Sequence, residues 1–263
     1  MRTFELFGHG IGYTASPLIH HAALTHLGVA DRYDYVVTDV SPADFPRALQ
    51  RFRRDGEGAN VTIPLKALAA AGCDALSEDA RLLDAANTIV RDGERLLGHN
   101  TDLPAIEEQL RILCPDGVRH AVVLGAGATS SAVQIALFHM DAAVTVAQRR
   151  DGTLRDVGRY LEQADLLVNT TPVGTASDES PVEPEYLHEG LAVFDLVYRP
   201  SPSALVRAAR EIGAPARGGA GMLVGQAWRS LALWLAQDGI TVGPDVAEPM
   251  LAALLEDLGA SDV

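Results

Sequence analysis

The chain has 263 residues, of which 48% are hydrophobic, so it can bury a full core and build two modest domains. Acidic residues outnumber basic ones by 35 to 21, which gives a formal net charge of −14. A surface of that sign repels nucleic acids and anionic membranes, so both are excluded as partners. The two cysteines, Cys73 and Cys114, lie far apart without metal-ligand spacing, and we expect neither a disulfide framework nor a metal site.

The N-terminus does not look like a targeting segment. Residues 1–8 contain no long apolar stretch followed by a small-residue cleavage site. No run elsewhere approaches the roughly 18 apolar residues of a membrane span. We therefore expect a soluble cytoplasmic protein, and the sequence leaves open whether it is a monomer or a homodimer.

Strand and helix signals alternate along the first hundred residues. Ser16-Pro17 and Ser41-Pro42 each place a helix-capping residue before a proline suited to the first helical position. Asp92-Gly93 separates two apolar runs, as in a β-hairpin. The signals predict strands at 4–7, 33–38, 60–63, 88–91 and 95–98, and helices at 18–27, 42–52, 65–71 and 79–85.

A nucleotide-binding pattern begins after a predicted helix at Asp102–Leu113. Ala121–Leu124 is a continuous apolar strand, followed by a glycine turn, an apolar helix reaching His139 and a second strand at 142–147. The turn is Gly125-Ala126-Gly127-Ala128-Thr129. Its glycines let the backbone approach a pyrophosphate at the helix N-terminus, where unpaired amides and the helix dipole favour anions. This order predicts a Rossmann-like dinucleotide site, the alternative being a glycine turn used only for close packing.

The end of the second strand bears on the choice of cofactor. An NAD site usually carries Asp or Glu there to bond the ribose 2′-hydroxyl. This chain has Gln148-Arg149-Arg150 instead, and arginine suits a 2′-phosphate. The sequence therefore favours NADP, with NAD as the alternative cofactor and a solvated basic turn as the alternative without one.

Two glycine-punctuated segments of the first hundred residues carry one charge each that suits proton transfer. Lys66 ends Gly58–Lys66, and Asp102 ends Gly98–Asp102. A lysine in a partly desolvated site can serve as acid or base, and an aspartate can hold it in place. The alternative is two unrelated surface loops with ordinary solvated charges. Because both segments follow predicted strands, where sites usually lie, we expect them to contribute to one site.

Taken together, these motifs resemble the shikimate dehydrogenase family over essentially the whole chain. The matching blocks are Asn60–Lys66, Ala85–Thr88, Asn100–Asp102, Asn169–Gly174, Asp195–Pro200 and Gly221–Gln226. Their number and order make the match far more specific than the glycine turn alone.

The resemblance implies a role for each matching residue. Lys66 would be the catalytic acid/base and Asp102 its partner. The substrate residues would be Thr14 and Ser16 at the carboxylate, Asn87 at the hydroxyls, and Thr62, Tyr198 and Gln226. The cofactor residues would be Gly125, Ala126, Gly127, Ala128, Thr129, Arg149, Arg150, Leu196 and Gly219.

Several departures from the family pattern also matter. Tyr13-Thr14 replaces the usual His-Ser, and Ala128 replaces the third glycine of the phosphate turn. Between Arg149 and a strand at 165–168 there is room for one short helix, at 154–163, where the family pattern needs a further helix and strand as well. The missing strand would lie at a sheet edge, so its loss would remove a wall of the adenosine pocket without breaking the fold.

The predicted fold is α/β with two domains. Residues 1–100 would form the substrate-binding domain, 101–219 a shortened Rossmann-like NADP-binding domain, and 220–263 C-terminal helices that pack on the substrate domain. The implied function is oxidoreduction of a small cyclic hydroxy acid such as shikimate, quinate or aminoshikimate. The alternative is a non-catalytic or regulatory ligand-binding paralogue with a degenerate cofactor domain.

The remaining polar residues carry weaker expectations. His99 is the one histidine that we expect near the site, because it precedes Asn100-Thr101-Asp102. His20 reads as an ordinary partly buried or surface side chain. The acidic residues Glu179, Glu183 and Glu185 are expected in a solvated loop, and Gln226 is expected at the polar start of an apolar helix.

Overall fold

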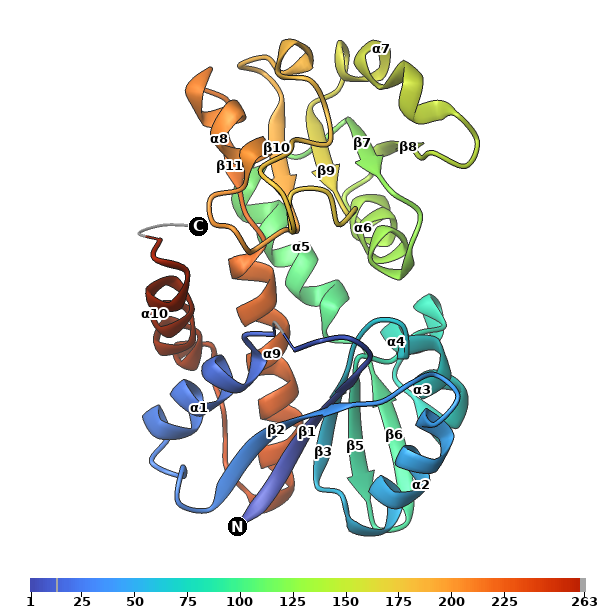
Figure 1. Cartoon of the computed structure of the whole chain (residues 1–263), viewed down its shortest axis with the longest axis vertical. Helices are drawn as coiled ribbons and strands as arrows, with labels where there is room; N and C mark the ends of the chain where they lie inside the picture. Colours follow the sequence, from blue (N-terminus) through green and yellow to red (C-terminus); the bar gives the residue numbers. More distant parts are fainter. Residues whose placement is uncertain (13, 261–263) are drawn as a thin grey trace. The chain divides into compact units, whose positions relative to one another are not determined.

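The computed structural model describes residues 1–12 and 14–260, so Tyr13 lies outside the described residues. Two sheets flanked by helices confirm the predicted α/β class (Figure 1). The chain folds into two compact units. The first comprises Met1–Thr101 and Val224–Leu254, and the second Asp102–Leu223 and the residues from Leu255 onward. No helix of the described residues is long and apolar enough to cross a membrane.

The first unit contains a mixed six-stranded sheet in the order β2-β1-β3-β5-β6-β4. Its strands are β1 Arg2–Gly8, β2 Tyr33–Asp39, β3 Gly58–Val61, β4 Ala75–Leu76, β5 Thr88–Asp92 and β6 Arg95–His99. The intervening helices are α1 Ser16–His26, α2 Phe45–Asp55, α3 Lys66–Gly72 and α4 Glu78–Leu83. The later part of the chain adds most of α9 Ala220–Leu235, η3 Ala236–Asp238, η4 Pro244–Val246 and most of α10 Ala247–Leu258. The predicted hairpin is present, because β5 and β6 pair antiparallel.

Alternating side chains of β1 pack on the two faces of this sheet. Phe7 meets the edges of Phe45 and Phe52 from α2, with ring centroids 5.8 Å away in both cases. Phe4 points to the other face and stacks on Trp234 of α9 at 4.7 Å. Residues three apart on a strand face opposite sides, so β1 anchors both layers. Figure 1 shows α2 and α3 together on one side of the sheet.

Both predicted Ser-Pro helix starts are wrong in detail. The N-cap of α1 is Ala15, and Ser16 is already helical, while its backbone N–H donates to Thr14 Oγ1 at 3.2 Å. The second helix begins at Phe45 rather than after Ser41. Ser41 Oγ instead accepts from Asp44 N–H at 3.2 Å, in a turn that precedes the helix. A serine hydroxyl can bond the backbone of a turn as readily as a helix end, and here the turn uses it.

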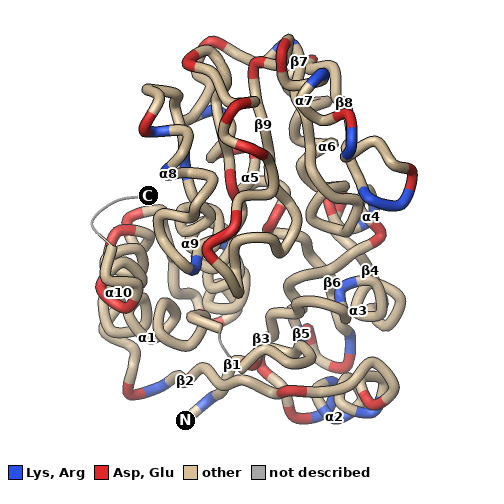
Figure 2. The backbone as a smooth tube through the Cα atoms, turned by 45° about the horizontal axis from the view of Figure 1, so that its top comes forward, with Lys and Arg blue, Asp and Glu red and all other residues tan. Residues whose placement is uncertain are grey.

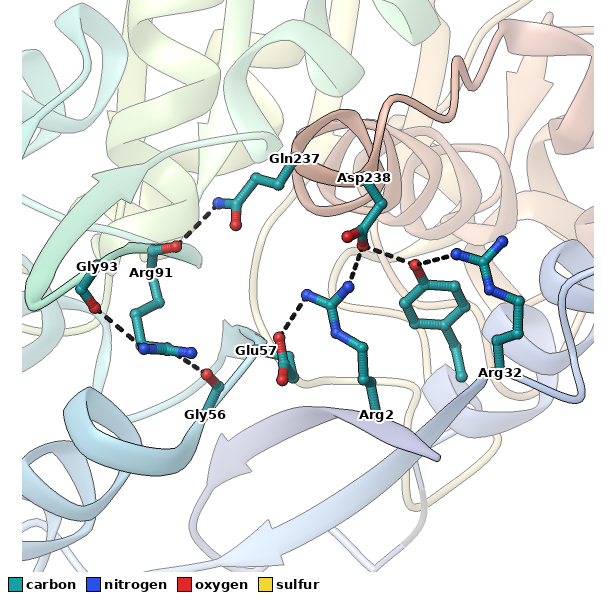
Figure 3. A network of polar contacts seen from close by, with 9 residues as sticks. Arg2, Arg32, Gly56, Glu57, Arg91, Gly93, Gln237 and Asp238 are labelled. Atoms are coloured by element: carbon teal, nitrogen blue, oxygen red, sulfur yellow. Dashed lines mark hydrogen bonds and ion pairs between the residues drawn. The ribbon is translucent and has the colours of Figure 1, made fainter.

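A polar cluster joins η3, the short turn that follows α9, to the sheet of the first unit (Figure 3). Arg2 forms ion pairs with Asp238 and, at 2.5 Å, with Glu57. The Tyr33 hydroxyl donates to Asp238 Oδ2 at 2.6 Å. Hydrogen bonds from Arg2 and Tyr33 hold the pKa of the Asp238 carboxyl below its usual range. The cluster thus fixes η3 against β1 and β2.

Replacing Asp238 with asparagine should lower the free energy of unfolding by about 1–2 kcal/mol at neutral pH. The folded-state pKa of Asp238 is depressed, so its contribution is present above the unfolded pKa and is lost as the pH falls. Urea unfolding of both proteins should therefore show a difference that shrinks below about pH 4. Asp31→Asn, at an exposed position of the same unit, is the control. A difference independent of pH would contradict the assignment.

The second unit contains a parallel five-stranded sheet in the order β11-β10-β9-β7-β8. Its strands are β7 His120–Leu124, β8 Ala143–Ala147, β9 Leu166–Asn169, β10 Ala192–Asp195 and β11 Ala216–Arg217. Its helices are α5 Asp102–Leu113, α6 Ala128–Phe138, α7 Val157–Leu161 and α8 Ala204–Glu211, with 3₁₀ turns η1 Thr153–Asp156 and η2 Pro184–Tyr186. All four residues of β9 and of β10 are buried, as expected for central parallel strands covered on both faces.

The shortened edge of this sheet confirms the sequence prediction. Among the described residues β8 pairs with β7 alone, so β8 is the edge strand. The predicted single helix at 154–163 is divided into η1 and α7. No further strand occurs between β8 and β9 in the described part of the chain.

Candidate active site

Three backbone hydrogen bonds fix the chain around Lys66. Thr62 follows β3, and its N–H donates to the Phe7 carbonyl at 2.8 Å. Leu65 N–H then donates to the Thr62 carbonyl at 2.8 Å, so the chain turns and α3 begins at Lys66. The Lys66 carbonyl accepts from Ala86 N–H at 3.0 Å, which places Lys66 beside the residue that precedes Asn87. The Lys66 side chain is half-buried.

Asn87 and Thr101 form a buried pair in the first unit. Thr101 N–H donates to Asn87 Oδ1 at 2.8 Å, and Asn87 Nδ2 donates to Thr101 Oγ1 at 2.9 Å. A backbone N–H can only donate, so this contact fixes the orientation of the amide. Asp102 follows Thr101 directly as the first residue of α5, and it begins the second unit. That Lys66 and Asp102 act in one site stays a prediction.

Thr14 and Ser16 are adjacent in the structure. Thr14 Oγ1 donates to Ser16 Oγ at 3.0 Å. Ser16 is 8% exposed, and its hydroxyl lies beside the hydroxyl of buried Tyr35. Burial raises the pKa of Tyr35, and the Ser16 hydroxyl partly opposes that rise. Each hydroxyl has one proton, so both can donate to one carboxylate once the Thr14 hydroxyl rotates away from Ser16 Oγ.

Gln226 does not lie at the start of its helix, contrary to the prediction. α9 begins at Ala220, so Gln226 lies more than one turn into it. The helix begins earlier than predicted, since the chain is already helical at Ala220 and Gly221. The Gln226 carbonyl accepts from Ser230 Oγ at 3.0 Å, and its side chain is half-buried.

The glycine turn of the second unit has the geometry of an anion site. Gly125 has a φ of +102°, which a residue with a side chain rarely adopts. Gly127 is the N-cap of α6, and Ala128 and Thr129 form its first turn. Ala126 is exposed, and the N-terminal amides of this eleven-residue helix can meet an anion.

A cavity of about 860 Å³ opens at the carboxyl ends of the strands of the second unit. Four of the predicted cofactor residues line it, namely Gly125, Ala126, Arg149 and Arg150. Leu196 and Gly219 adjoin each other in the same unit: a Cβ on Gly219 would lie 2.2 Å from the Leu196 carbonyl oxygen, so only glycine fits. Ligands of parallel α/β sheets bind at this edge.

The loop after β8 contains a carboxylate that the sequence reasoning overlooked. Asp151 follows the two exposed arginines, and Figure 2 shows blue and red segments together in this loop. Its carboxylate accepts from Thr153 Oγ1 at 2.6 Å and from Gln148 Nε2 at 2.7 Å. These bonds, with the Thr153 backbone N–H, lower the pKa of Asp151. Asp151 is thus engaged within its own loop, and Arg149 and Arg150 line the cavity.

The acidic segment after β9 also lines the cavity. Glu179 and Glu183 are exposed, as predicted for a solvated loop, and Asp178 is exposed as well, but all three form part of the cavity wall. Asp178 forms an ion pair with Arg207 of α8. The sequence analysis did not predict this wall, because no local pattern shows that the segment after β9 lies beside the loop after β8.

Two motif residues have a structural role in the second unit. Asn169 Nδ2 donates to Asp195 Oδ1 at 2.8 Å, and Ser203 Oγ donates to Asp195 Oδ2 at 2.6 Å. Burial raises the pKa of Asp195, while its hydrogen bonds oppose the rise. The pair joins the ends of β9 and β10, and so positions the loops that carry Thr171 and Leu196.

Two histidines differ in their relation to the site. His99 contributes through its backbone, since its carbonyl accepts from Asn87 N–H at 3.0 Å. Its ring is half-buried, and this burial lowers its pKa against the opposing effect of Asp79. His20, expected to be partly buried or exposed, is fully buried and stacks on Tyr35 at 4.1 Å. Burial lowers the pKa of His20 to about 3, so its ring is neutral.

A parallel sheet, a glycine turn at a helix N-terminus and a cavity at the strand ends define a dinucleotide-binding α/β protein. A family model for the shikimate dehydrogenase substrate-binding domain matches residues 6–89. Shikimate 5-dehydrogenase from Thermus thermophilus, solved with NADP(H) and shikimate, is 33% identical over 97% of this chain and 100% of that one, with a TM-score of 0.84. Quinate dehydrogenase from Corynebacterium glutamicum, solved with NAD, is 26% identical over 97% and 99%, with a TM-score of 0.86. The chain belongs to the shikimate dehydrogenase family of oxidoreductases.

Proposed function

We propose that the protein catalyses the reversible NADP-dependent reduction of 3-dehydroshikimate to shikimate, or the same reaction on a close analogue such as quinate or aminoshikimate. The observation that carries this proposal is that Lys66 is the only lysine among 21 lysine and arginine residues. Arginine is not deprotonated in proteins, whereas lysine can exchange a proton. The other 20 positions of this set are arginine, so the single lysine lies where the proposed reaction needs an acid/base group.

The first unit would hold the substrate. Thr14 and Ser16 would donate to its carboxylate, and Thr62 and Gln226 would make further contacts. Asn87 Oδ1 already accepts from Thr101 N–H, so Asn87 would meet a ring oxygen as a donor through its amide nitrogen. This polarity suits either a ring hydroxyl or a ring carbonyl.

The second unit would hold the dinucleotide. The amides of Gly125–Thr129 would receive the pyrophosphate, and Arg149 and Arg150 the 2′-phosphate. Leu196 and Gly219 would lie by the nicotinamide, and Tyr198 would contact the substrate. The cofactor, when bound, supplies or accepts the hydride. Lys66 would give or take the accompanying proton at the ring oxygen, with Asp102 as its partner.

The direct test is a set of assays that crosses shikimate, quinate and aminoshikimate with NADP and NAD, following the absorbance of the reduced nicotinamide. We expect turnover with at least one ring acid and faster turnover with NADP. Modification with an amine-specific reagent gives a second readout, because Lys66 is its only side-chain target besides the N-terminal amine. Loss of activity that the ring acid and NADP prevent would support the assignment. Full activity after complete modification of Lys66 would refute it.

A second candidate is a ligand-binding protein without turnover. The observation that favours it is the edge position of β8, which leaves the cofactor sheet one strand shorter than the family pattern. Calorimetry separates the two functions. A ring acid that binds while neither NADP nor NAD binds would support the non-catalytic function.

Thr14→Ala and Ser16→Ala should each weaken binding of the ring acid by about 1.5–3 kcal/mol, the range for a hydrogen bond to a charged group. Calorimetric titration of shikimate measures the loss directly. Thr25→Ala, which removes an exposed hydroxyl from the same region of the chain, is the matched control and should bind as the wild type does. Unchanged affinity in both Thr14→Ala and Ser16→Ala would place the carboxylate elsewhere.

A further inference from the structure

Buried polar side chains of the first unit form one connected hydrogen-bond network. Each of its members is at most 5% exposed. We call it the Ser230 network, and its members are Tyr35, Asn60, Asn87, Thr88, Thr101 and Ser230. They come from β2, β3, β5, α9 and the two segments that flank the β5–β6 hairpin. Buried hydroxyl and amide groups destabilise the fold unless they are hydrogen-bonded. Six such side chains in one network therefore point to a role in holding neighbouring residues in place.

Ser230 lies at the centre of the network and is fully buried. Its Oγ is 2.9 Å from Asn60 Nδ2, 2.7 Å from Thr88 Oγ1 and 3.1 Å from Thr101 Oγ1. It also donates to the carbonyl of Gln226, one helical turn earlier, at 3.0 Å. One hydroxyl therefore contacts four separate groups.

The amide of Asn60 fixes the direction of one branch. Asn60 Nδ2 donates to the Asn87 backbone carbonyl at 3.2 Å, and a carbonyl can only accept. Asn60 Oδ1 must then accept from the Tyr35 hydroxyl, 2.9 Å away. The Ser16 hydroxyl lies beside the Tyr35 hydroxyl, so this branch reaches the Thr14–Ser16 pair.

The other branch ends at Asn87. Asn87 Oδ1 accepts from Thr101 N–H at 2.8 Å and lies 3.0 Å from Thr88 Oγ1. With Ser230 donating to Gln226, the Thr88 hydroxyl can donate to Ser230 Oγ, and the Thr101 hydroxyl can donate to Asn87 Oδ1 at 3.2 Å. Each of these three hydroxyl protons then has an acceptor. A fully satisfied buried network is rigid and specifies one arrangement.

From this geometry we infer that Ser230 is a positioning residue for the substrate site. Ser230 does not line the site itself. It acts through Gln226 on α9, through Asn87, and through Thr101, which directly precedes Asp102. This inference rests on the proposed function, because those residues are the proposed substrate and proton-transfer groups. Without the Ser230 hydroxyl, Asn60, Thr88 and Thr101 each lose a contact, and the Thr88 and Thr101 hydroxyls beside the Asn87 amide are no longer held in one arrangement.

Ser230→Ala should lower kcat/KM for the ring acid by about 10- to 100-fold, because a small displacement of positioning groups is costly to rate. KM for NADP should stay within about twofold, since the dinucleotide residues lie in the other unit. Ser77→Ala is the matched control. Ser77 caps α4 by accepting a hydrogen bond from Ala80 N–H at 3.2 Å. This control therefore also removes one hydroxyl hydrogen bond from the first unit, but at a position outside the Ser230 network. Both variants are compared at a temperature where circular dichroism shows them folded.

Amide hydrogen exchange of Thr101, followed by NMR, gives a readout that does not need turnover. Its N–H donates to Asn87 Oδ1, so exchange should accelerate in Ser230→Ala and not in Ser77→Ala. Unchanged exchange at Thr101 would overturn the inference. So would kcat/KM equal to that of Ser77→Ala in an enzyme whose wild type turns over. If the wild type neither turns over nor binds any ring acid, the proposed function fails, and the exchange result alone decides for or against the Ser230 network.

Discussion

Lys66→Ala is expected to lower kcat by about 10²-fold or more, with a much smaller change in KM for the ring acid. A group that transfers a proton in the transition state contributes to kcat, and its removal leaves ground-state binding largely intact. The fold should tolerate the substitution, because Lys66 begins α3 and alanine retains the hydrogen bond from Ala86 N–H to the carbonyl of residue 66. Steady-state kinetics with the preferred ring acid measures both parameters.

Lys66→Arg separates proton transfer from charge. Arginine keeps the positive charge but cannot give up a proton, so this variant should be impaired about as severely as Lys66→Ala. Asp102→Asn should also lower kcat by about 10²-fold, because asparagine can neither accept a proton nor pair with an ammonium as a charge. Near-wild-type turnover in Lys66→Ala and Asp102→Asn would exclude the mechanism. High activity in Lys66→Arg alone would mean that Lys66 acts by charge.

Much of the fold could be predicted because its signals are local. The helix at Asp102–Leu113 has the predicted bounds, and the β5–β6 hairpin follows from Asp92-Gly93 between two apolar runs. The glycine turn before α6 is likewise contained in five consecutive residues. Strands β4 and β11 were not predicted, because two residues are too few to show a period.

The contacts that organise the site could not be predicted from local patterns. Tyr35 and Ser230 are 195 positions apart, yet both bond the side chain of Asn60. A serine inside an apolar helix gives no sign that it is the centre of a network. The same holds for His20, whose burial depends on the rings of Tyr35 and Trp234. The roles of such residues can be recognised only from the tertiary structure, in which α9 packs on the sheet.

The Arg149→Ala, Arg150→Ala double variant is expected to lose about 10- to 100-fold in affinity for NADP, while its affinity for NAD changes by less than about threefold. Charge-assisted hydrogen bonds from arginine to a phosphate are strong. NAD has no 2′-phosphate, so its binding does not depend on these bonds. The remaining charges increase the effect. Asp178, Glu179 and Glu183 line the same cavity, so removal of the arginines leaves a wall that repels the dianion. Titration of both cofactors by tryptophan fluorescence gives the ratio.

Arg159→Ala, in α7 and outside the lining of the cavity, controls for the general loss of positive charge and should leave the ratio of NADP to NAD affinity unchanged. Salt provides an independent check. Arg149 and Arg150 are exposed, so wild-type affinity for NADP should fall with ionic strength more steeply than affinity for NAD. In the double variant the two slopes should converge. A double variant that keeps the wild-type ratio would show that the arginines do not contact the 2′-phosphate. Tighter binding of NAD than NADP by the wild type would instead indicate that the acidic wall dominates the cavity.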